Sequence, residues 1–279
     1  MDETGKSLSD TINGIRRDIR GKNPLVHCIT NPISINQVAN TILAAGARPM
    51  CAEYPIEAAA VTASAGALML NLGNLTGVRA EAMRLSAKEA HSRGIRFVLD
   101  VCGAACLENR REYALELIRD YKPQIIKGNY SEIKALVNKD YSSSGVDADG
   151  SLEIKEIISA AGTLAAKYGA VVLASGKEDV VTNGKDTLLI GNGTPQLSAI
   201  TGTGCMQGAL CAAFLTVSDG LEAAAAAAVM LGICGELSET DKGSGSFLVN
   251  LLDNLSTVKD ENIEKLINIR LVNSRQKTN

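Results

Sequence analysis

Short apolar segments alternate with longer amphipathic ones along most of the chain. Residues 25–30, 67–72, 97–101, 124–127 and 170–174 are predicted to be apolar strands with little polar alternation. Strands of this kind are buried on both faces, which is typical of a parallel sheet covered by helices. The repeated strand–helix order therefore predicts an α/β fold with three layers, helix–sheet–helix.

The segments between these strands carry apolar residues at helical spacing. The clearest stripe covers residues 151–168, and another covers residues 8–19, before the first strand. Asn31 followed by Pro32 is a typical N-cap and first helical residue, so we expect the next helix to begin there. Gly46 marks the expected end of that helix.

A hairpin signal interrupts the alternation in the last third of the chain. Val180–Thr182 and Thr187–Ile190 flank an Asn-Gly pair, which predicts an antiparallel hairpin at the edge of an otherwise parallel sheet. Beyond residue 208 the pattern is helical throughout, and helices are expected over 209–216, 221–237, 247–255 and 263–271. The polar stretch 138–151 is interpreted as a surface loop, so the chain is expected to form a single domain over residues 1–279.

Composition and charge narrow the classes of partner. The chain has 279 residues, 46% of them hydrophobic and 3% aromatic, and a formal net charge of −3. Without a basic block or aromatic platforms, nucleic acid is not an expected partner. The longest apolar run, 223–234, is too short to span a membrane. The apolar and small-residue face of 221–235 could be core or subunit contact and is interpreted as core. Seven cysteines among apolar neighbours, with no signal peptide, favour a cytoplasmic protein with reduced thiols.

The stretch Thr201–Cys205 is the first candidate for chemistry. Its two glycines lead into a run of small and apolar residues, so unpaired backbone N–H groups at a helix start would form an anion site. A cysteine at such a position is expected to have a lowered thiol pKa. The glycine spacing is one residue longer than a dinucleotide fingerprint, so an ordinary strand-to-helix turn remains an alternative.

Two carboxylates follow the ends of neighbouring predicted strands. Asp100 closes one strand, and Glu132 comes shortly after the next. Because ligands of open parallel sheets bind beyond the carboxyl ends of the strands, these side chains are candidates to hold hydrated Mg²⁺ against phosphates. Each could instead be an ordinary helix-capping or first-turn acid. Together with an anion-binding loop they predict phosphoryl transfer, although no P-loop motif is present. His27 on the first strand is interpreted as structural rather than as a catalytic base.

Six stretches of the chain together resemble the hydroxyethylthiazole kinase family, within the ribokinase-like superfamily. They are His27–Asn31, Ala47–Met50, Asn71–Leu75, Lys127–Glu132, Ser175–Asp179 and Thr201–Cys205. The resemblance implies a ribokinase-like fold and ATP-dependent phosphorylation of 4-methyl-5-(2-hydroxyethyl)thiazole in thiamine salvage. It also implies a homotrimer that binds the thiazole between subunits.

The resemblance also assigns roles to individual residues. Met50 and Gly202 would contact the thiazole, and Lys127 and Ser175 would contact ATP. The family often has arginine where Lys127 stands. Lysine keeps the positive charge, but it lacks the paired N–H groups with which an arginine guanidinium binds phosphate. Cys205 occupies the place where most ribokinase-like enzymes have an aspartate base, so it would orient the hydroxyl or take its proton. The amides of residues 202–205 would stabilise the transferring phosphoryl group.

One segment departs from the family pattern. Asp100 and Glu132 fall in the family's Mg²⁺ and phosphate region, but residues 101–110 lack the usual second glycine, threonine and second proline. Glu108 adds an acid that would repel phosphate unless it faces solvent. Because of this segment, the interpretation as a thiazole-binding protein with impaired catalysis remains an alternative. A kinase for hydroxymethylpyrimidine or another vitamin precursor also stays open, as does an enzyme that uses Cys205 as a nucleophile.

Overall fold

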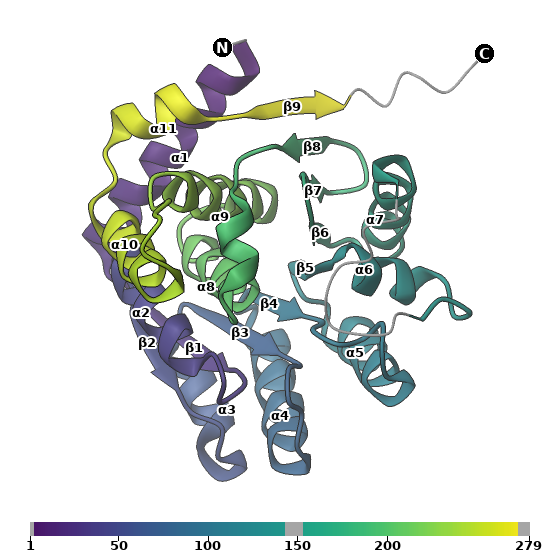
Figure 1. Cartoon of the computed structure of the whole chain (residues 1–279). Helices are drawn as coiled ribbons and strands as arrows, with labels where there is room; N and C mark the ends of the chain where they lie inside the picture. The colour runs from purple at the N-terminus through teal and green to yellow at the C-terminus, as the bar shows by residue number, and fades with distance from the viewer. Residues whose placement is uncertain (1–2, 143–152, 273–279) are drawn as a thin grey trace, which may run out of the picture.

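A twisted sheet forms the centre of the molecule (Figure 1). The structure is a computed structural model that describes residues 3–142 and 153–272. Over these residues the sheet has nine strands in the order β2-β1-β3-β4-β5-β6-β7-β8-β9. Their bounds are β1 Leu25–Ile29, β2 Arg48–Cys51, β3 Ala67–Asn71, β4 Phe97–Asp100, β5 Ile125–Asn129, β6 Val171–Ser175, β7 Asp179–Thr182, β8 Thr187–Ile190 and β9 Ile269–Val272. The strands β1 to β6 pair in parallel, whereas β7, β8 and β9 continue the sheet by antiparallel pairing.

Helices cover both faces of the sheet because neighbouring strand residues point to opposite sides. Met69 packs into one apolar cluster, and Leu68 and Leu70 pack into another on the opposite face. The first cluster receives α1 Glu3–Lys22, α2 Ile35–Ala45, α8 Thr203–Leu215, α9 Gly220–Glu236, α10 Ser244–Thr257 and α11 Asp260–Leu266. The second receives α3 Pro55–Ser64, α4 Gly77–Arg93, α5 Glu108–Tyr121, α6 Tyr130–Val137 and α7 Ile154–Tyr168. This arrangement confirms the three-layer α/β prediction.

Several finer predictions are also confirmed. The expected strands and the hairpin are present, and α2 ends at Gly46 in the left-handed conformation. Residues 223–235 of α9 are buried within the chain itself, as expected for core. Of the expected surface loop 138–151, the part from residue 143 onwards lies outside the described residues.

Two predictions about element boundaries are wrong. Residues 263–271 were expected to form one helix, but α11 ends at Leu266 and 269–272 form β9. The exposed edge of β8 offers unpaired backbone groups, and pairing with β9 satisfies them. The predicted antiparallel edge of the sheet is confirmed, with β9 added outside the hairpin as the outermost strand. The helix expected at Asn31 begins at Ile35, because the Asn31 side chain accepts the amides of Ile33 and Ser34 and holds a turn instead.

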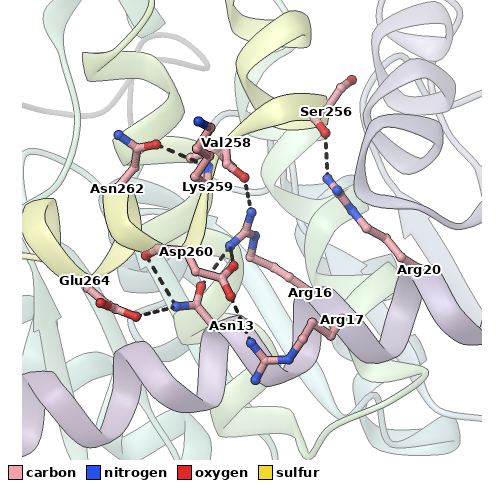
Figure 2. Close-up of polar contacts among 10 residues, drawn as sticks. All are labelled: Asn13, Arg16, Arg17, Arg20, Ser256, Val258, Lys259, Asp260, Asn262 and Glu264. Carbon is pink, nitrogen blue, oxygen red and sulfur yellow. Dashed lines mark hydrogen bonds and ion pairs between the residues drawn. The ribbon is translucent and has the colours of Figure 1, made fainter.

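An arginine cluster ties the first helix to the last ones (Figure 2). Arg16 is buried and donates to the Asp260 carboxylate, the Val258 carbonyl and Asn13. Arg17 pairs with the same carboxylate at 2.9 Å from the exposed side. Figure 2 shows that the contacts reach from α1 to the segment joining α10 and α11. The C-terminal part that leads into β9 is therefore anchored on α1.

Candidate active site

Polar side chains gather where three neighbouring parallel strands end. In the registered pairing of β3, β4 and β5, Asn71 stands beside Asp100 and Asp100 beside Lys127. All three are buried. The carboxyl ends of parallel strands meet at one edge of a sheet, and that edge is where open α/β sheets bind their ligands. The helix α8 packs above this point, against β3 and β4.

Asp100 and Lys127 form a buried ion pair. The Lys127 ammonium lies 3.3 Å from Oδ2 of Asp100, while Oδ1 has no hydrogen-bond partner among the described residues. Burial raises the pKa of Asp100, and the Lys127 charge opposes that rise. Burial lowers the pKa of Lys127, but the nearby Asp100 and Glu132 carboxylates outweigh it, so the net pKa lies above the ordinary value. Lys127 is therefore a fixed cation, and the free Asp100 oxygen can accept a further ligand.

Glu132 stands beside this pair on the first turn of α6. Its Oε1 accepts the amide of Gly103 and its Oε2 accepts the amide of Asn129, both at 2.7 Å. Burial, followed by the Asp100 charge, raises the pKa of Glu132 to about 7. Glu132 is also an acid in the first turn of a helix, as the alternative interpretation expected, because it completes a capping box with Asn129 at the start of α6. Each oxygen keeps a second lone pair, so binding a metal-bound water remains possible.

Glycines at the start of α8 allow charged groups to approach its backbone. Gly202 has φ +97°, a left-handed conformation that disfavours other residues, and any Cβ there would lie 2.9 Å from the Cβ of Ser34. A Cβ at Gly204 would lie 3.1 Å from the Lys127 ammonium. The ammonium therefore lies close to the first turn of α8, and a side chain at position 204 would crowd it.

Cys205 lies on this first turn and faces two asparagine amides. Asn31 and Asn71 donate their Nδ2 groups to its sulfur at 3.5 and 3.4 Å. The sequence predicted a lowered thiol pKa, and this is wrong. Burial and the negative charge of Asp100 raise the pKa of Cys205. Hydrogen bonds to the sulfur and the positive charge of Lys127 lower this pKa, but their effect is smaller. A largely protonated thiol at neutral pH does not suit the covalent-nucleophile alternative.

A cavity of about 650 Å³ lies beside the start of α8. The sequence-predicted Ser175 lines it at the end of β6, together with the turn that joins β6 to β7. Thr203, Gly204 and Gln207 of α8 also line it, and Leu231 of α9 contributes an apolar side chain. Because a Cβ at Gly204 would lie 3.1 Å from the Lys127 ammonium, the ion pair lies close to this part of the lining. This size and this mixed lining suit a small-molecule ligand with an anionic end.

Two further sequence-predicted residues lie away from the ion pair. Met50 is on the edge strand β2 with a side chain 40% exposed, so one side of it remains open. His27 is buried, and its ring nitrogens lie 2.8 Å from the Thr62 hydroxyl and the Ala52 carbonyl. Burial lowers the pKa of His27. This agrees with the prediction that His27 is structural.

The atypical segment 101–110 packs beside the site without placing an acid in it. Gly103 donates its amide to Glu132, and Arg110 donates to the carbonyl of Cys102 at 3.3 Å. Glu108 is exposed at the first residue of α5, where a negative charge is favourable. Glu108 therefore faces solvent, and its charge is not directed at a phosphate in the site.

Four residues around the site received no role from the sequence. Asn71 is the last residue of β3 just as Asp100 is of β4, and Asn31 follows the end of β1 by two residues, so the rule that found Asp100 could have found both. Asp179 and Gln207 are joined by a hydrogen bond of 2.6 Å across the cavity wall. Gln207 is a polar position in an otherwise apolar helix, which was the available signal.

The fold and the site together define a class of protein. A cavity lined by the start of a helix, with a buried lysine and an unpartnered carboxylate oxygen close by, is suited to phosphoryl transfer. The fold is similar to that of a ribokinase-like superfamily protein from Enterococcus faecalis V583, with a TM-score of 0.61 over 85% of this chain and 87% of that one at 13% identity. The chain is a kinase with a ribokinase-like fold.

Sequence comparison identifies the particular family. Residues 17–261 match the hydroxyethylthiazole kinase family. A relative named hydroxyethylthiazole kinase 2, from Clostridium botulinum strain Langeland, is 42% identical over 91% of this chain and 98% of its own length. The structure of a hydroxyethylthiazole kinase protein from Pyrococcus horikoshii OT3 matches with a TM-score of 0.86 and 32% identity, over 94% of this chain and 98% of that one. The chain belongs to the hydroxyethylthiazole kinase family.

Proposed function

We propose that this enzyme transfers the γ-phosphoryl group of ATP to the hydroxyl of 4-methyl-5-(2-hydroxyethyl)thiazole, a reaction of thiamine salvage. Family membership supports the choice of acceptor. The observation that carries the proposal is the position of Lys127, which pairs with Asp100 and lies close to Gly204, a residue of the cavity lining. A cation held there meets the negative charge of a phosphate chain.

The nucleotide occupies the cavity in this proposal. Ser175 and Lys127 contact ATP, and the phosphates point toward the amides of residues 202–205. The apolar part of the cavity near Leu231 suits a base, and the polar end suits phosphates. The start of α8 adds the positive end of its dipole where charge develops during transfer.

Mg²⁺ accompanies ATP in the proposal, held by Asp100 and, through water, by Glu132. The fit is supported by the unpartnered buried Oδ1 of Asp100 and by the remaining lone pairs of Glu132. Over residues 3–142 and 153–272, no three His, Cys, Asp or Glu side chains form a metal cage. Mg²⁺ bound mainly by phosphates and water needs only one or two carboxylates, and it would neutralise phosphate charge.

The thiazole lies on the other side of the α8 start. Gly202 and Met50 contact the ring in this proposal, and Cys205 faces its hydroxyl. Because burial raises the pKa of Cys205, the thiol mainly orients the hydroxyl rather than removing its proton at neutral pH. A loose transition state for phosphoryl transfer needs little help from a strong base.

The proposed assembly is a homotrimer with the thiazole between subunits, within a single kinase domain over residues 1–279. Support comes from exposed apolar side chains around β2, α2 and the start of α3, namely Ile33, Leu43, Met50, Tyr54 and Ile56. A patch of this kind marks an interaction surface more often than a free one.

We further propose a cytoplasmic location, for which the odd number of cysteines is the support. In the described part of the chain, none of the helices has the length and apolar character needed to cross a membrane.

A panel of acceptors with Mg-ATP tests the proposal, with ADP release as the readout and light scattering for the mass. We expect turnover with the hydroxyethylthiazole, much less with hydroxymethylpyrimidine, and a mass of three chains. Turnover confined to hydroxymethylpyrimidine would transfer the proposal to that substrate. Thiazole binding without ADP release would indicate a binding protein, and a monomeric mass would contradict the shared site.

A further inference from the structure

The turn between β6 and β7 forms one wall of the cavity. Ser175 at the end of β6, Gly176 and Lys177 of the turn, and Asp179 at the start of β7 line the cavity, as does Gln207 of α8. Only Ser175 has a role in the reaction proposed above. Pairing with Asn129 of β5 holds the backbone of Ser175, whereas the position of the turn that follows it depends on other contacts.

One carboxylate joins the turn to the catalytic helix. Asp179 Oδ1 accepts the amide of Gly176 at 3.0 Å, and Asp179 Oδ2 accepts Nε2 of Gln207 at 2.6 Å. Gln207 is 4% exposed and lies two residues after Cys205 on α8. The Asp179 side chain thus bridges the turn that carries Ser175 and the helix that begins at the anion-binding loop.

A tyrosine holds the turn from behind. The Tyr130 hydroxyl donates to the carbonyl of Glu178, and a Cβ at Gly176 would lie only 2.5 Å from the Tyr130 ring. The turn is therefore confined between this ring and the Asp179–Gln207 hydrogen bond. Without that hydrogen bond the turn would keep its contact with Tyr130 and the ion pair between Glu178 and Arg270 of β9, but it would lose this link to α8.

A carboxylate is an unexpected group in the wall of a site for a polyanion. Repulsion between Asp179 and phosphates would weaken binding, unless the carboxylate organises the site. The charged or titratable groups that act on it or feel its charge are Lys127 from β5, Tyr130 from α6 and Cys211 from α8, beside Glu178 on the turn itself. Of these, Lys127 is a cation and offsets part of the repulsion.

We propose that Asp179 and Gln207 are positioning residues that hold the nucleotide-binding turn in register with the start of α8. This inference rests on the proposed function, since it takes the cavity as the ATP site. The pair acts through Ser175 and Gly176 and touches no reacting atom. Loss of the Asp179–Gln207 hydrogen bond lowers the affinity for ATP and leaves the thiazole site unchanged.

The protonation state of Asp179 gives the proposal a pH signature. Burial raises the pKa of Asp179 to about 6, against hydrogen bonds from Gly176 and Gln207 and the charge of Lys127. Above this pH the ionised carboxylate accepts both N–H groups, and below it the proton occupies one oxygen. The affinity for ATP should therefore fall as pH drops through about 6.

Two variants of the full-length protein test the pair. Asp179→Asn removes the charge at nearly constant size, and Gln207→Met removes the donor. We expect the Kd for ATP, measured by calorimetry without acceptor, to rise about tenfold in each, as expected for the loss of one charged hydrogen bond. The Kd for the thiazole should stay within about twofold in both, since the pair does not touch that site. Asp186→Asn, an exposed carboxylate on the turn between β7 and β8, is the matched control and should bind ATP as the wild type does.

The pH profile separates positioning from a general loss of structure. In the wild type the Kd for ATP should rise below pH about 6, and in Asp179→Asn this rise should be smaller, leaving only the part due to Glu132 and to the terminal phosphate of ATP, which titrate in both proteins. In Gln207→Met it should begin at higher pH, because a donor that lowers the Asp179 pKa is missing. Thermal melts show whether each variant folds, and either variant alone suffices for the test.

The outcomes distinguish this inference from the proposed function. Wild-type ATP affinity in both folded variants, or equal losses for ATP and thiazole, would overturn the positioning role while leaving the kinase reaction intact. The expected ATP and pH effects without any phosphorylation of the thiazole would uphold the inference and overturn the choice of acceptor. A wild-type protein that binds no ATP would overturn both.

Discussion

At the scale of single residues, burial decides the chemistry of the site. A lysine removed from water would ordinarily lose its proton, yet Lys127 is held as a cation by Asp100 and Glu132. The same burial keeps Cys205 protonated, against the effect that a helix start usually has on a thiol. Lys127 and Cys205 are therefore a permanent charge and a neutral hydrogen-bonding group.

Replacing the cation gives the largest expected effect on activity. Lys127→Met should lower kcat/KM for ATP about 10²- to 10³-fold, because it removes a preorganised charge at the phosphate end of the cavity. Coupled measurement of ADP release against ATP concentration checks this. Lys127→Arg keeps the charge and should retain much more activity. Equal losses in both variants would mean that shape rather than charge matters at this position.

The thiol has a smaller expected effect. Cys205→Ala should lower kcat about tenfold with an unchanged KM for ATP, because an orienting hydrogen bond is lost and no base is removed. The kcat of wild type and variant should show the same dependence on pH between 6 and 8. An alkaline limb lost on mutation would show that Cys205 acts as a base, and an unchanged kcat would show that it has no role.

At the scale of elements, buried polar contacts fix the positions of helices that the apolar core alone leaves adjustable. The amphipathic helix α1 could slide along the apolar cluster at little cost, but Arg16 fits one place between Val258 and Asp260. Buried polar groups without partners are costly, so such contacts select one arrangement. The Asn31 turn acts in the same way on the start of α2.

Removal of the buried arginine tests this anchoring. Arg16→Met should lower the free energy of unfolding by about 2–3 kcal/mol, since several charge-assisted hydrogen bonds are lost and Asp260 keeps part of its solvation. Urea unfolding followed by circular dichroism measures the change. Arg17→Met is the control, because Arg17 is 64% exposed and its ion pair should contribute less than about 1 kcal/mol. Similar losses in the two variants would argue against the anchoring role of Arg16.

At the scale of the whole molecule, several exposed apolar side chains lie on elements next to the β2 edge. They are Ile33, Leu43, Met50, Tyr54 and Ile56, around the edge strand β2. A parallel edge strand left open beside apolar side chains is a site for association. The proposed shared thiazole site lies at this patch through Met50.

A charge placed in the patch tests the assembly. Ile56, which is 81% exposed, costs the single chain little when replaced, so Ile56→Asp should leave the fold intact. The variant should shift from trimer to smaller species in light scattering and lose affinity for the thiazole, with ATP binding retained. Val137→Asp, at the end of α6, which packs against β5 and β6 rather than at the β2 edge, should remain a trimer. A trimeric Ile56→Asp variant would place the interface elsewhere.

The sequence alone determined the layer architecture, the hairpin, the helix caps at glycines and the candidate residues at strand ends, because periodicity and backbone preferences are local properties. Only the tertiary structure decided that 269–272 pair with β8, since a short segment such as Ile269–Val272 takes its conformation from the edge available to it. It also decided the ionisation of Cys205 and the partners of Asp179 and Gln207. These depend on burial and on charges from strands and helices distant in sequence, and no spacing along the chain records those distances.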